Sequence, residues 1–572
     1  MRSRLARRIA TASLLAASAA GVALDGTAVA APHLAHRTTT HLQRSPSPRP
    51  PAGPRLTALA VPAQHIAPSV SWPRPEWVSP TVTGTSIGYV AQSSPTVATY
   101  DGRTIVTVGA ENGDVYVADA ATGKELPGWP QQMAAPPGAS VAIESSPAVA
   151  WLDGPDAPPS IVVGSGSTWV PDSVGEVEAF RLDGARRWVF RVGAAPHTAI
   201  GVISSPAIGD ITGSGRPDVV FGSWNHDIYA LDSAGKVLPG FPYDNADTIW
   251  SSPALYHLPG HKGEDIFLGS DASGRVFTDA AGRQRCVGGF VGDYRYVDHT
   301  VRRAWFHCEN QSIWSSPAIG VIGSSTRPVV VVGTSFYYQP FPSDTDKVFA
   351  FYADSGAPVP GWPVSTRGPA LGSPAIGVVN SSGQPAVVET SWVCDASDRV
   401  SCLASGHSAV GAWSGSGRPL WSQTLIGPTD LASPVLVPLR GASTDDVLVG
   451  SPNGLYPLDG ATGAYLYGTN GTNQFAAVNP GCRVFNSVAV ADVPGTGPAG
   501  GWHAFEACGG PRAFAVPGEI VDYRLPVQPS TQAAWPMFRG GPEHDGVAFT
   551  SMPGPKASVP GSSPVVTPAP GG

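Results

Sequence analysis

The stretch SSPAIGDITGSGRPDVVFGSWNHDIYALDSAGKVLPGFP, residues 204–242, contains four short apolar runs separated by turn residues. These runs, at 204–211, 218–223, 228–232 and 237–242, predict four strands, because each is short, apolar or β-branched, and bounded by Gly, Pro, Asn, Asp or Ser. Four consecutive strands joined by tight turns form one antiparallel sheet.

The opening of this unit recurs along the whole chain as a small residue, a proline and then apolar residues. The prolines are Pro95, Pro147, Pro206, Pro253, Pro317, Pro374 and Pro434, and Val488 takes the eighth position. The mean spacing is about 56 residues, a period that fits one multi-strand sheet per repeat. The sequence therefore predicts an all-β protein, a β-propeller of four-stranded blades, with eight blades and seven as the alternative.

The start of the ring is a separate question, because SWPRPEW, residues 71–77, precedes the first repeat. We interpret it either as an outer strand that closes the ring against AAWPMFRGG, residues 533–541, or as a packed extension.

Composition divides the chain into four parts. Residues 1–30 have a basic start, an apolar stretch and small residues at the end, which predicts a secretory signal peptide, exported by either the Sec or the twin-arginine route. Residues 31–70 form a Pro/Ser/Thr-rich lead-in and 551–572 a Pro/Gly-rich tail, both predicted to be disordered, and 71–550 form the propeller. We expect a secreted, extracellular monomer without a membrane span.

Charge and cysteine content narrow the class of partner and compartment. A net charge of -8 lacks the basic surface that a phosphate backbone requires, so nucleic acid is not an expected partner. The six cysteines suit an oxidising compartment and allow 15 pairings, of which three local ones are predicted. These pairs are Cys286 with Cys308, Cys394 with Cys402, and Cys482 with Cys508.

The repeat also carries a family resemblance. VYVADAATGKELPGWP, residues 115–130, is similar to the PQQ repeat in its Asp119, Thr122, Gly123 and Trp129, and the 204–242 unit resembles the blades of FG-GAP-like and quinoprotein-like bacterial secreted propellers. AAWPMFRGGPEHDG, from residue 533, is similar to the segment that ends many bacterial members. The resemblance implies an architecture that hosts enzymes, adhesion modules and assembly factors alike.

Two functional features of that family are weak or missing. Its quinone-dependent dehydrogenases carry two adjacent cysteines beneath the cofactor, and no two cysteines are neighbours here, so neither PQQ nor another cofactor is expected. Calcium-binding members have a DxDxDG-like loop, for which the best match is DITGSGRPD. Its oxygen-bearing residues form either a weak Ca²⁺ site or a plain glycine-rich turn; they are Asp210, Thr212, Ser214 and Asp218.

Aromatic residues collect in the connections that precede strand A and follow strand B, which emerge on the same face of a four-stranded meander. They are Trp169, Trp224, Trp250, Trp314, Phe336, Tyr337 and Trp392. Each would either fill the gap between blades or contribute to a face that binds a sugar ring or an extended peptide. The insert at 286–308 adds Arg302 and Arg303, which would recognise an acidic sugar or carboxylate, or belong to a solvated loop.

Catalytic signals are poor. His197, His226, His299 and His407 are isolated in sequence, and no nucleophile elbow occurs, so no catalytic residue is predicted. The leading hypothesis is a non-catalytic binding or scaffold propeller that recognises an extracellular carbohydrate or protein on its aromatic face. The alternatives are an extracellular enzyme, either a quinone-dependent oxidoreductase or a polysaccharide lyase or hydrolase, and an assembly or adhesion partner that binds protein strands at blade edges.

Overall fold

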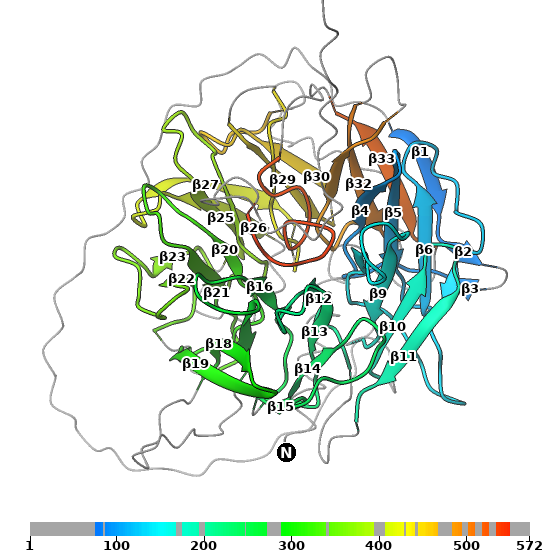
Figure 1. Ribbon diagram of the computed structural model, residues 1–572. Helices are drawn as coiled ribbons and strands as arrows, with labels where there is room; N and C mark the ends of the chain where they lie inside the picture. The colour runs from blue at the N-terminus through cyan, green and yellow to red at the C-terminus, as the bar shows by residue number, and fades with distance from the viewer. Residues whose placement is uncertain are drawn as a thin grey trace, which may run out of the picture.

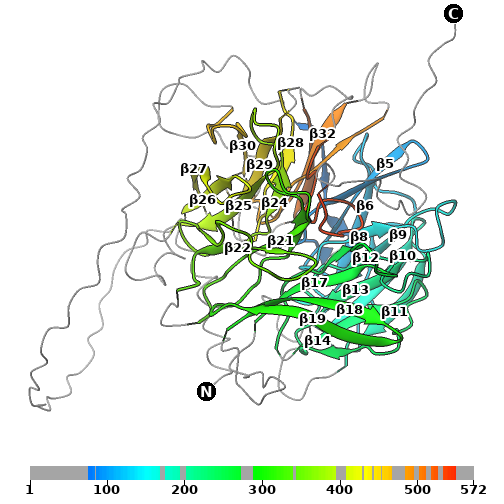
Figure 2. The same cartoon turned by 60° about the vertical axis from the view of Figure 1, so that its left-hand side comes forward.

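The computed structural model describes the chain from residue 75 to residue 548, with gaps, as eight antiparallel sheets around a central axis (Figures 1 and 2). The residues within these limits that are left undescribed are 84–85, 168–173, 194–200, 246, 272–287, 339–342, 394–406, 428, 430, 441–443, 453, 467–482, 495–500, 510–516 and 526–532. The prediction of an all-β propeller with eight four-stranded blades is confirmed, and the seven-blade alternative is wrong. A membrane-crossing helix does not occur in the described part of the chain.

Each blade is a meander whose strands are called A to D from the axis outward. Blade 1 holds β4 (Thr96–Tyr100), β5 (Arg103–Gly109), β6 (Asp114–Asp119) and β7 (Gln131–Gln132); blade 2 holds β8 (Ala148–Ala150), β9 (Ser160–Gly164), β10 (Glu176–Arg181) and β11 (Arg186–Arg191). Blade 3 holds β12 (Ala207–Gly209), β13 (Asp218–Gly222), β14 (Asp227–Leu231) and β15 (Tyr243–Asp244); blade 4 holds β16 (Ala254–Tyr256), β17 (Asp265–Ser270), β18 (Phe290–Val297) and β19 (Thr300–Cys308).

The second half of the ring repeats this order. Blade 5 holds β20 (Ala318–Gly320), β21 (Val329–Gly333), β22 (Lys347–Tyr352) and β23 (Val364–Ser365); blade 6 holds β24 (Ala375–Gly377), β25 (Ala386–Trp392), β26 (His407–Trp413) and β27 (Pro419–Ile426). Blade 7 has three described strands, β28 (Val435–Val437), β29 (Asp446–Ser451) and β30 (Gly454–Leu458). Blade 8 combines β31 (Ala489–Asp492), β32 (Trp502–Cys508) and β33 (Glu519–Arg524) with β1 (Pro75–Pro80), and β2 (Val82–Thr83) pairs with β3 (Ser86–Ile87) in a separate ribbon.

The ring is closed by the start of the chain. Strand β1 pairs antiparallel with β33, from Pro75 opposite Tyr523 to Pro80 opposite Glu519, and becomes the outer strand of blade 8. In Figure 1 this blue strand lies beside the orange last blade. An outer strand was one of our two interpretations of this segment, but its predicted partner, 533–541, is wrong because that segment lies in the central channel.

Strand D of the 204–242 unit also differs from its prediction. Residues 237–242 supply only a single bridge, from Val237 to Leu231, and β15 begins at Tyr243. Pro239 and Pro242 have no backbone N–H to donate to a ladder, and Gly240 has a φ of 90°, outside the strand region. The stretch is therefore a turn that leads into the outer strand.

The repeated serine explains why the motif recurs. The backbone N–H before each strand A donates to the serine hydroxyl of the next blade, over 2.8–3.1 Å, and the eight bonds form a closed circle. We call these buried residues the serine ring: Ser94, Ser146, Ser205, Ser252, Ser316, Ser373, Ser433 and Ser487. In blades 1 to 5 the serine before each ring member accepts from a glycine N–H at the end of strand B of its own blade. The dipeptide thus joins blade to blade and strand to strand.

Residues 533–548 fill the channel, and we call them the plug. The plug appears as the red segment at the centre of the ring in Figure 1. Its carbonyl oxygens accept hydrogen bonds from one strand A residue in each of six blades, namely Val149, Ile208, Leu255, Ile319, Leu436 and Val490. Its buried Arg539 donates to the carbonyl oxygens of Pro253, at 2.8 Å, and of Pro317, and His544 Nε2 lies 3.0 Å from Thr96 Oγ1 of blade 1. The innermost strand edges are thereby paired inside the protein.

Tryptophans of the outer strands and their turns join neighbouring blades at the periphery. Trp129 Nε1 donates to Leu182 O at 2.8 Å and Trp188 Nε1 to Ser233 O at 3.2 Å, in each case across to the following blade. Four more indoles make the equivalent bond; they are Trp77, Trp305, Trp362 and Trp421. These tryptophans have the packing role, and they are different residues from those of the aromatic face.

Candidate functional site

The residue immediately before the serine dipeptide, or its equivalent, faces the mouth of the channel. In seven blades this residue lines one pocket, together with six members of the serine ring and Phe538 of the plug. We call the seven residues the mouth ring: Gln92, Glu144, Ile203, Trp250, Trp314, Leu371 and Leu431. The pocket is small, about 50 Å³, and it has two chemically distinct halves. Blades 1 and 2 contribute an amide and a carboxyl group, whereas blades 3 to 7 contribute apolar and aromatic side chains.

The apolar half continues outward as a chain of five aromatic rings over blades 3 to 6. Trp224 lies 4.9 Å from Trp250 between ring centroids, Trp250 lies 4.9 Å from Trp314 in a stacked arrangement, Trp314 lies 5.4 Å from Phe336, and Phe336 lies 5.4 Å from Trp392. We call this chain the aromatic arc. Trp392 is buried and the other four rings are half-buried, so part of their surface stays open to a ligand.

The arc unites two kinds of connection. Trp250 and Trp314 lie just before strand A, and Trp224, Phe336 and Trp392 lie at or after the end of strand B. Their mutual contacts place both sets on one face of the ring, as the meander requires. Tyr337 contacts Tyr338, at 5.2 Å, and lies beside the arc rather than within its chain of contacts. Trp169 lies outside the described residues.

Glu144, which lines the polar half of the pocket, lies near a second carboxyl group from the adjacent blade. Glu111 follows strand B of blade 1, and Glu144 precedes strand A of blade 2. The Ser167 hydroxyl donates to Glu144 Oε1 at 2.6 Å. Burial raises the pKa of Glu111 well above its usual range, and the charge of Glu144 raises it further. We call Gln92, Glu111 and Glu144 the acidic sector.

A second buried carboxyl pair lies next to the arc in blade 4. Thr248 Oγ1 donates to Asp271 Oδ2 at 2.8 Å, and burial, followed by the charge of Asp247, raises the pKa of Asp271. His226 Nε2 lies 3.8 Å from Asp247 Oδ1. The face that carries the aromatic arc is therefore also rich in buried acceptor groups.

Sequence reasoning missed the acidic sector. The signal that would have found it is positional: the residue before the serine dipeptide is Gln, Glu, Ile, Trp, Trp, Leu and Leu in seven successive blades. The second serine of the dipeptide is present in every blade because the serine ring needs it, whereas the residue before the dipeptide changes from polar to apolar around the mouth.

The two arginines of the 286–308 segment lie elsewhere. This segment was predicted to be an irregular insert, but Phe290–Val297 and Thr300–Cys308 are the regular strands β18 and β19, joined at Asp298 and His299, whose φ angles of 50° and 62° suit a tight hairpin turn. Arg302 is exposed on the outer strand, and the Arg303 guanidinium lies 4.3 Å from the centre of the Phe306 ring. Neither arginine belongs to the aromatic arc.

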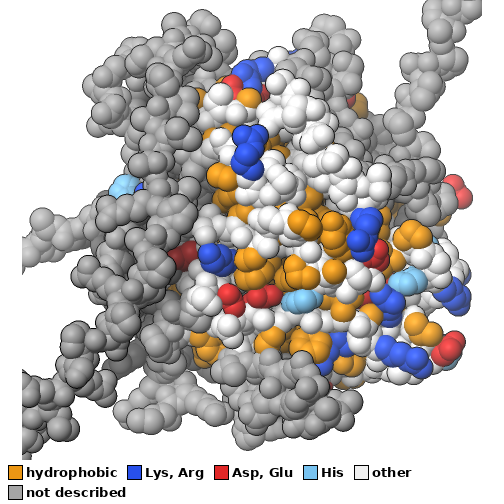
Figure 3. Space-filling model, turned by 90° about the vertical axis from the view of Figure 1, so that its left-hand side faces the viewer, with side chains coloured by type: hydrophobic (Ala, Val, Ile, Leu, Met, Phe, Trp, Pro, Cys, Tyr) orange, Lys and Arg blue, Asp and Glu red, His pale blue; other side chains and the backbone are white. Residues whose placement is uncertain are grey.

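The outer wall offers no concentrated charge on the side that Figure 3 displays. Acidic, basic and hydrophobic side chains are interspersed there among the described residues. Polar and apolar side chains are separated at the channel mouth, as described above.

The predicted calcium ligands lie together in the A–B turn of blade 3, where they bond to one another. Asp210 accepts from the N–H groups of Ser214, at 2.9 Å, and Gly215, at 2.6 Å, while Thr212 N donates to Asp218 Oδ2 at 3.2 Å. Burial raises the pKa of Asp218 to about 7. The geometry is that of a hydrogen-bonded turn, and no group of three or more His, Cys, Asp or Glu side chains able to hold a metal occurs in the described ranges.

The predicted disulfides fall mostly on undescribed positions. Cys308 ends β19 and Cys508 ends β32. Cys286, Cys394, Cys402 and Cys482 lie outside the described residues, so the three pairings stay predictions.

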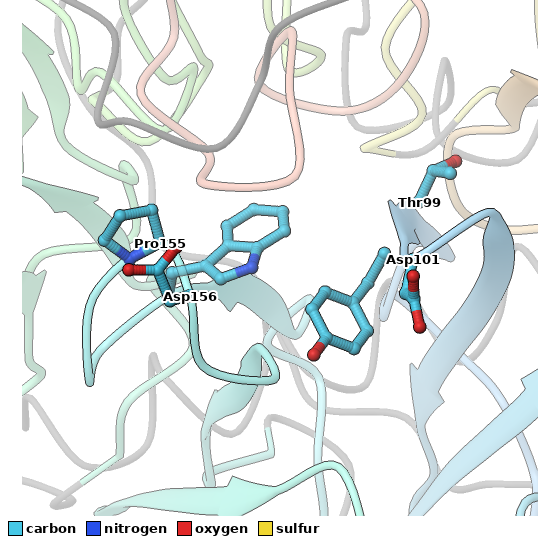
Figure 4. A pocket seen from close by; sticks show the side chains of 6 residues that line it. Thr99, Asp101, Pro155 and Asp156 are labelled. Carbon is cyan, nitrogen blue, oxygen red and sulfur yellow. The ribbon is translucent and has the colours of Figure 1, made fainter. Parts of the chain in front are cut away.

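The opposite face, at the A–B turns of blades 1 and 2, has an open pocket of about 380 Å³ (Figure 4). Thr99 and Asp101 line it on one side, and Pro155 and Asp156 on the other, with Tyr100 and Trp151 completing the lining. It is separate from the aromatic arc, and its residues therefore serve as controls for experiments on the arc.

Comparison with known proteins supports the fold. No protein-family model matches the sequence, and no curated protein matches it. Among solved structures, the chain is similar to the quinohemoprotein alcohol dehydrogenase of Comamonas testosteroni, with 14% identity, a TM-score of 0.51, and coverage of 79% of this chain and 76% of that one. It is also similar to the V. cholerae biofilm matrix protein Bap1, with 13% identity, a TM-score of 0.38, and coverage of 79% of this chain and 91% of that one. At 14% identity the likeness to the dehydrogenase concerns the fold alone.

Proposed function

We propose that this protein is an extracellular, non-catalytic binding propeller that recognises a carbohydrate at the channel mouth. The observation that carries the proposal is the aromatic arc, in which five rings from four blades form one continuous, largely half-buried surface. Aromatic rings present flat apolar faces that suit the C–H faces of sugar rings, and nearby polar groups then fix orientation.

The surroundings of the arc support a ligand rather than packing alone. The tryptophans that fill gaps between blades lie on outer strands or in the turns before them, and they donate to a carbonyl oxygen of the following blade. By contrast, Trp250 and Trp314 line the pocket at the axis, and the buried Nε1 of Trp392 has no hydrogen-bond partner in the described structure. A donor left without a partner beside half-buried aromatic rings suits the hydroxyl groups of a sugar.

The test is calorimetric titration of the purified full chain with a panel of neutral, acidic and amino oligosaccharides. We expect at least one class to bind, and Trp250→Ala and Trp314→Ala to weaken it by about tenfold or more, equivalent to about 1.4 kcal/mol per ring. Tyr100→Ala removes a half-buried aromatic side chain from the opposite face and should leave binding unchanged. Thermal unfolding of each variant checks that the fold is intact.

Two outcomes would contradict the proposal. The first is that no member of the panel binds the wild-type chain. The second is that folded Trp250→Ala and Trp314→Ala variants bind with wild-type affinity, which would place the ligand away from the aromatic arc.

A further inference from the structure

The aromatic arc continues past the axial pocket on both sides. Trp250 and Trp314 line that pocket, and the other three rings of the arc do not. Trp224 extends the arc over blade 3, 4.9 Å from Trp250, and Phe336 extends it over blade 5, 5.4 Å from Trp314. Trp224 and Phe336 are both half-buried, so each leaves ring surface that a ligand confined to the pocket would not cover.

The pocket itself is too small to enclose a sugar. Its volume is about 50 Å³, whereas pockets that enclose small-molecule ligands measure about 300–1,000 Å³. A glycan that binds at the mouth must therefore lie across the opening, with no more than a substituent inside it. A monosaccharide held within the pocket does not fit these dimensions.

The charge of the pocket lining indicates which class of glycan fits. Glu144 is the one ionisable side chain among the described residues that line the pocket, and its Oε1 already accepts a hydrogen bond of 2.6 Å from the Ser167 hydroxyl. None of the described lining residues is a lysine or arginine. A uronate or sulfate group would therefore meet a carboxyl group and no compensating cation in this lining, whereas an uncharged sugar brings no such group.

Resting on the proposed carbohydrate function, we infer that the ligand is an internal stretch of a neutral polysaccharide, which lies across the mouth and contacts the arc from Trp224 to Phe336. The polysaccharide continues past the pocket in both directions, because accessible ring surface continues in both directions. The protein then recognises a length of chain, and neither a free sugar nor a chain end is sufficient for full affinity.

The experiment is a calorimetric titration of the full chain with disaccharides and hexasaccharides of β-1,4-linked glucose, mannose and xylose. We expect at least one neutral hexasaccharide to bind roughly tenfold or more tightly than its own disaccharide, because the longer chain reaches additional aromatic rings. The hexasaccharide of α-1,4-linked galacturonic acid, which carries a carboxylate on every residue, should bind more weakly than this neutral chain. These comparisons use the wild-type protein and need no variant.

Variants at the outer rings then locate the polysaccharide on the arc. Trp224→Ala and Phe336→Ala should weaken binding of the hexasaccharide more than binding of the disaccharide, whereas Trp314→Ala should weaken both. Tyr100→Ala, which removes a half-buried aromatic side chain from the opposite face, should change neither. Thermal unfolding of each variant checks that the fold is intact.

Stoichiometry separates an internal stretch from a chain end. With a long polymer of the same neutral sugar, of known mean length, the titration should saturate with several protein molecules on each polysaccharide chain. One protein molecule per chain would indicate recognition of a chain end and would overturn the inference. An acidic hexasaccharide that binds more tightly than every neutral one would overturn it as well.

Failure of the inference differs from failure of the proposed function. If a disaccharide binds as tightly as its hexasaccharide and Trp314→Ala weakens both, the carbohydrate function stands and the extended ligand is wrong. If only acidic or amino oligosaccharides bind, and Trp314→Ala weakens them, the function stands and the neutral class is wrong. If no glycan binds, both fall.

Discussion

Substitution Ser252→Ala tests the role of the serine ring most directly. Ser252 Oγ accepts from the N–H of Ser205 over 2.9 Å, and both residues are about 3% exposed. Alanine keeps the backbone and the β-carbon but removes the acceptor, so that the Ser205 N–H is left buried at the boundary between blades 3 and 4.

The expected cost follows from this geometry. Leaving one buried N–H without a partner costs about 1–3 kcal/mol, and the lost atom itself is small, so packing adds little. Because the same bond recurs in every blade over 2.8–3.1 Å, alanine at Ser146 or Ser316 should cost the same within about 1 kcal/mol. An equal loss in the free energy of unfolding at different blades would indicate that all members of the serine ring contribute alike.

The assay combines urea unfolding with amide hydrogen exchange. Ser252→Ala should lower the free energy of unfolding by about 1–3 kcal/mol and reduce protection of the Ser205 amide more than that of the Gly269 amide. The matched control, Ser251→Ala, removes the acceptor of the Gly269 N–H within blade 4. It should reduce protection of the Gly269 amide more than that of the Ser205 amide. A Ser252→Ala variant within 0.5 kcal/mol of wild type, with a protected Ser205 amide, would refute the reasoning because it would show that another group or a water satisfies this donor.

Three further predictions concern the plug, buried carboxyls and disulfides. Removing 533–572 should destabilise the protein by at least about 3 kcal/mol in urea unfolding, because six strand N–H groups lose their partners, whereas removing 549–572 alone should have no such effect. Burial raises the pKa of Glu389 to about 8, so the folded chain holds a proton that the unfolded chain releases near pH 4.5. The free energy of unfolding should therefore fall from pH 5 to pH 8, by up to about 1.4 kcal/mol per pH unit for this group. Urea unfolding at a series of pH values should show a smaller fall for Glu389→Gln than for the wild-type chain. Non-reducing peptide mapping should link Cys286 to Cys308, and a link from Cys286 to any other cysteine contradicts local pairing.

The blade number could be predicted from the sequence because it depends on a repeated local requirement. Each blade needs a serine hydroxyl just before strand A, and the sequence contains eight copies of the motif that includes this serine. Strand D at 237–242 could not be placed correctly, because its apolar residues suggest a strand while its prolines prevent one. The partner of β1 could not be predicted either, since a pairing across more than 400 residues leaves no local pattern.

The site was predictable only where it used an unusual residue type. Tryptophan before strand A attracts notice twice, at Trp250 and Trp314, and those two residues do meet at 4.9 Å. The arginines of β19 were grouped with them because of their chemistry, although strand geometry places them on the outer wall. Glu111 is a single glutamate in a short loop, and only the three-dimensional ring brings it beside Glu144 from the next blade.

In a propeller, the residues that hold the blades together are distinct from those that are available to bind a ligand. The serine ring and the mouth ring are two such sets, and they lie close together in the sequence of each blade. The serine ring is constant, since loss of any member leaves an unpaired donor in the circle. The mouth ring, two residues earlier, carries no such bond and differs from blade to blade. Its order is polar over blades 1 and 2 and apolar over blades 3 to 7, and no hydrogen bond of the serine ring depends on it. Variation at a position outside the serine ring, when it sorts by chemistry around one opening, therefore adds to the aromatic arc as an argument for the carbohydrate site that we propose at the mouth.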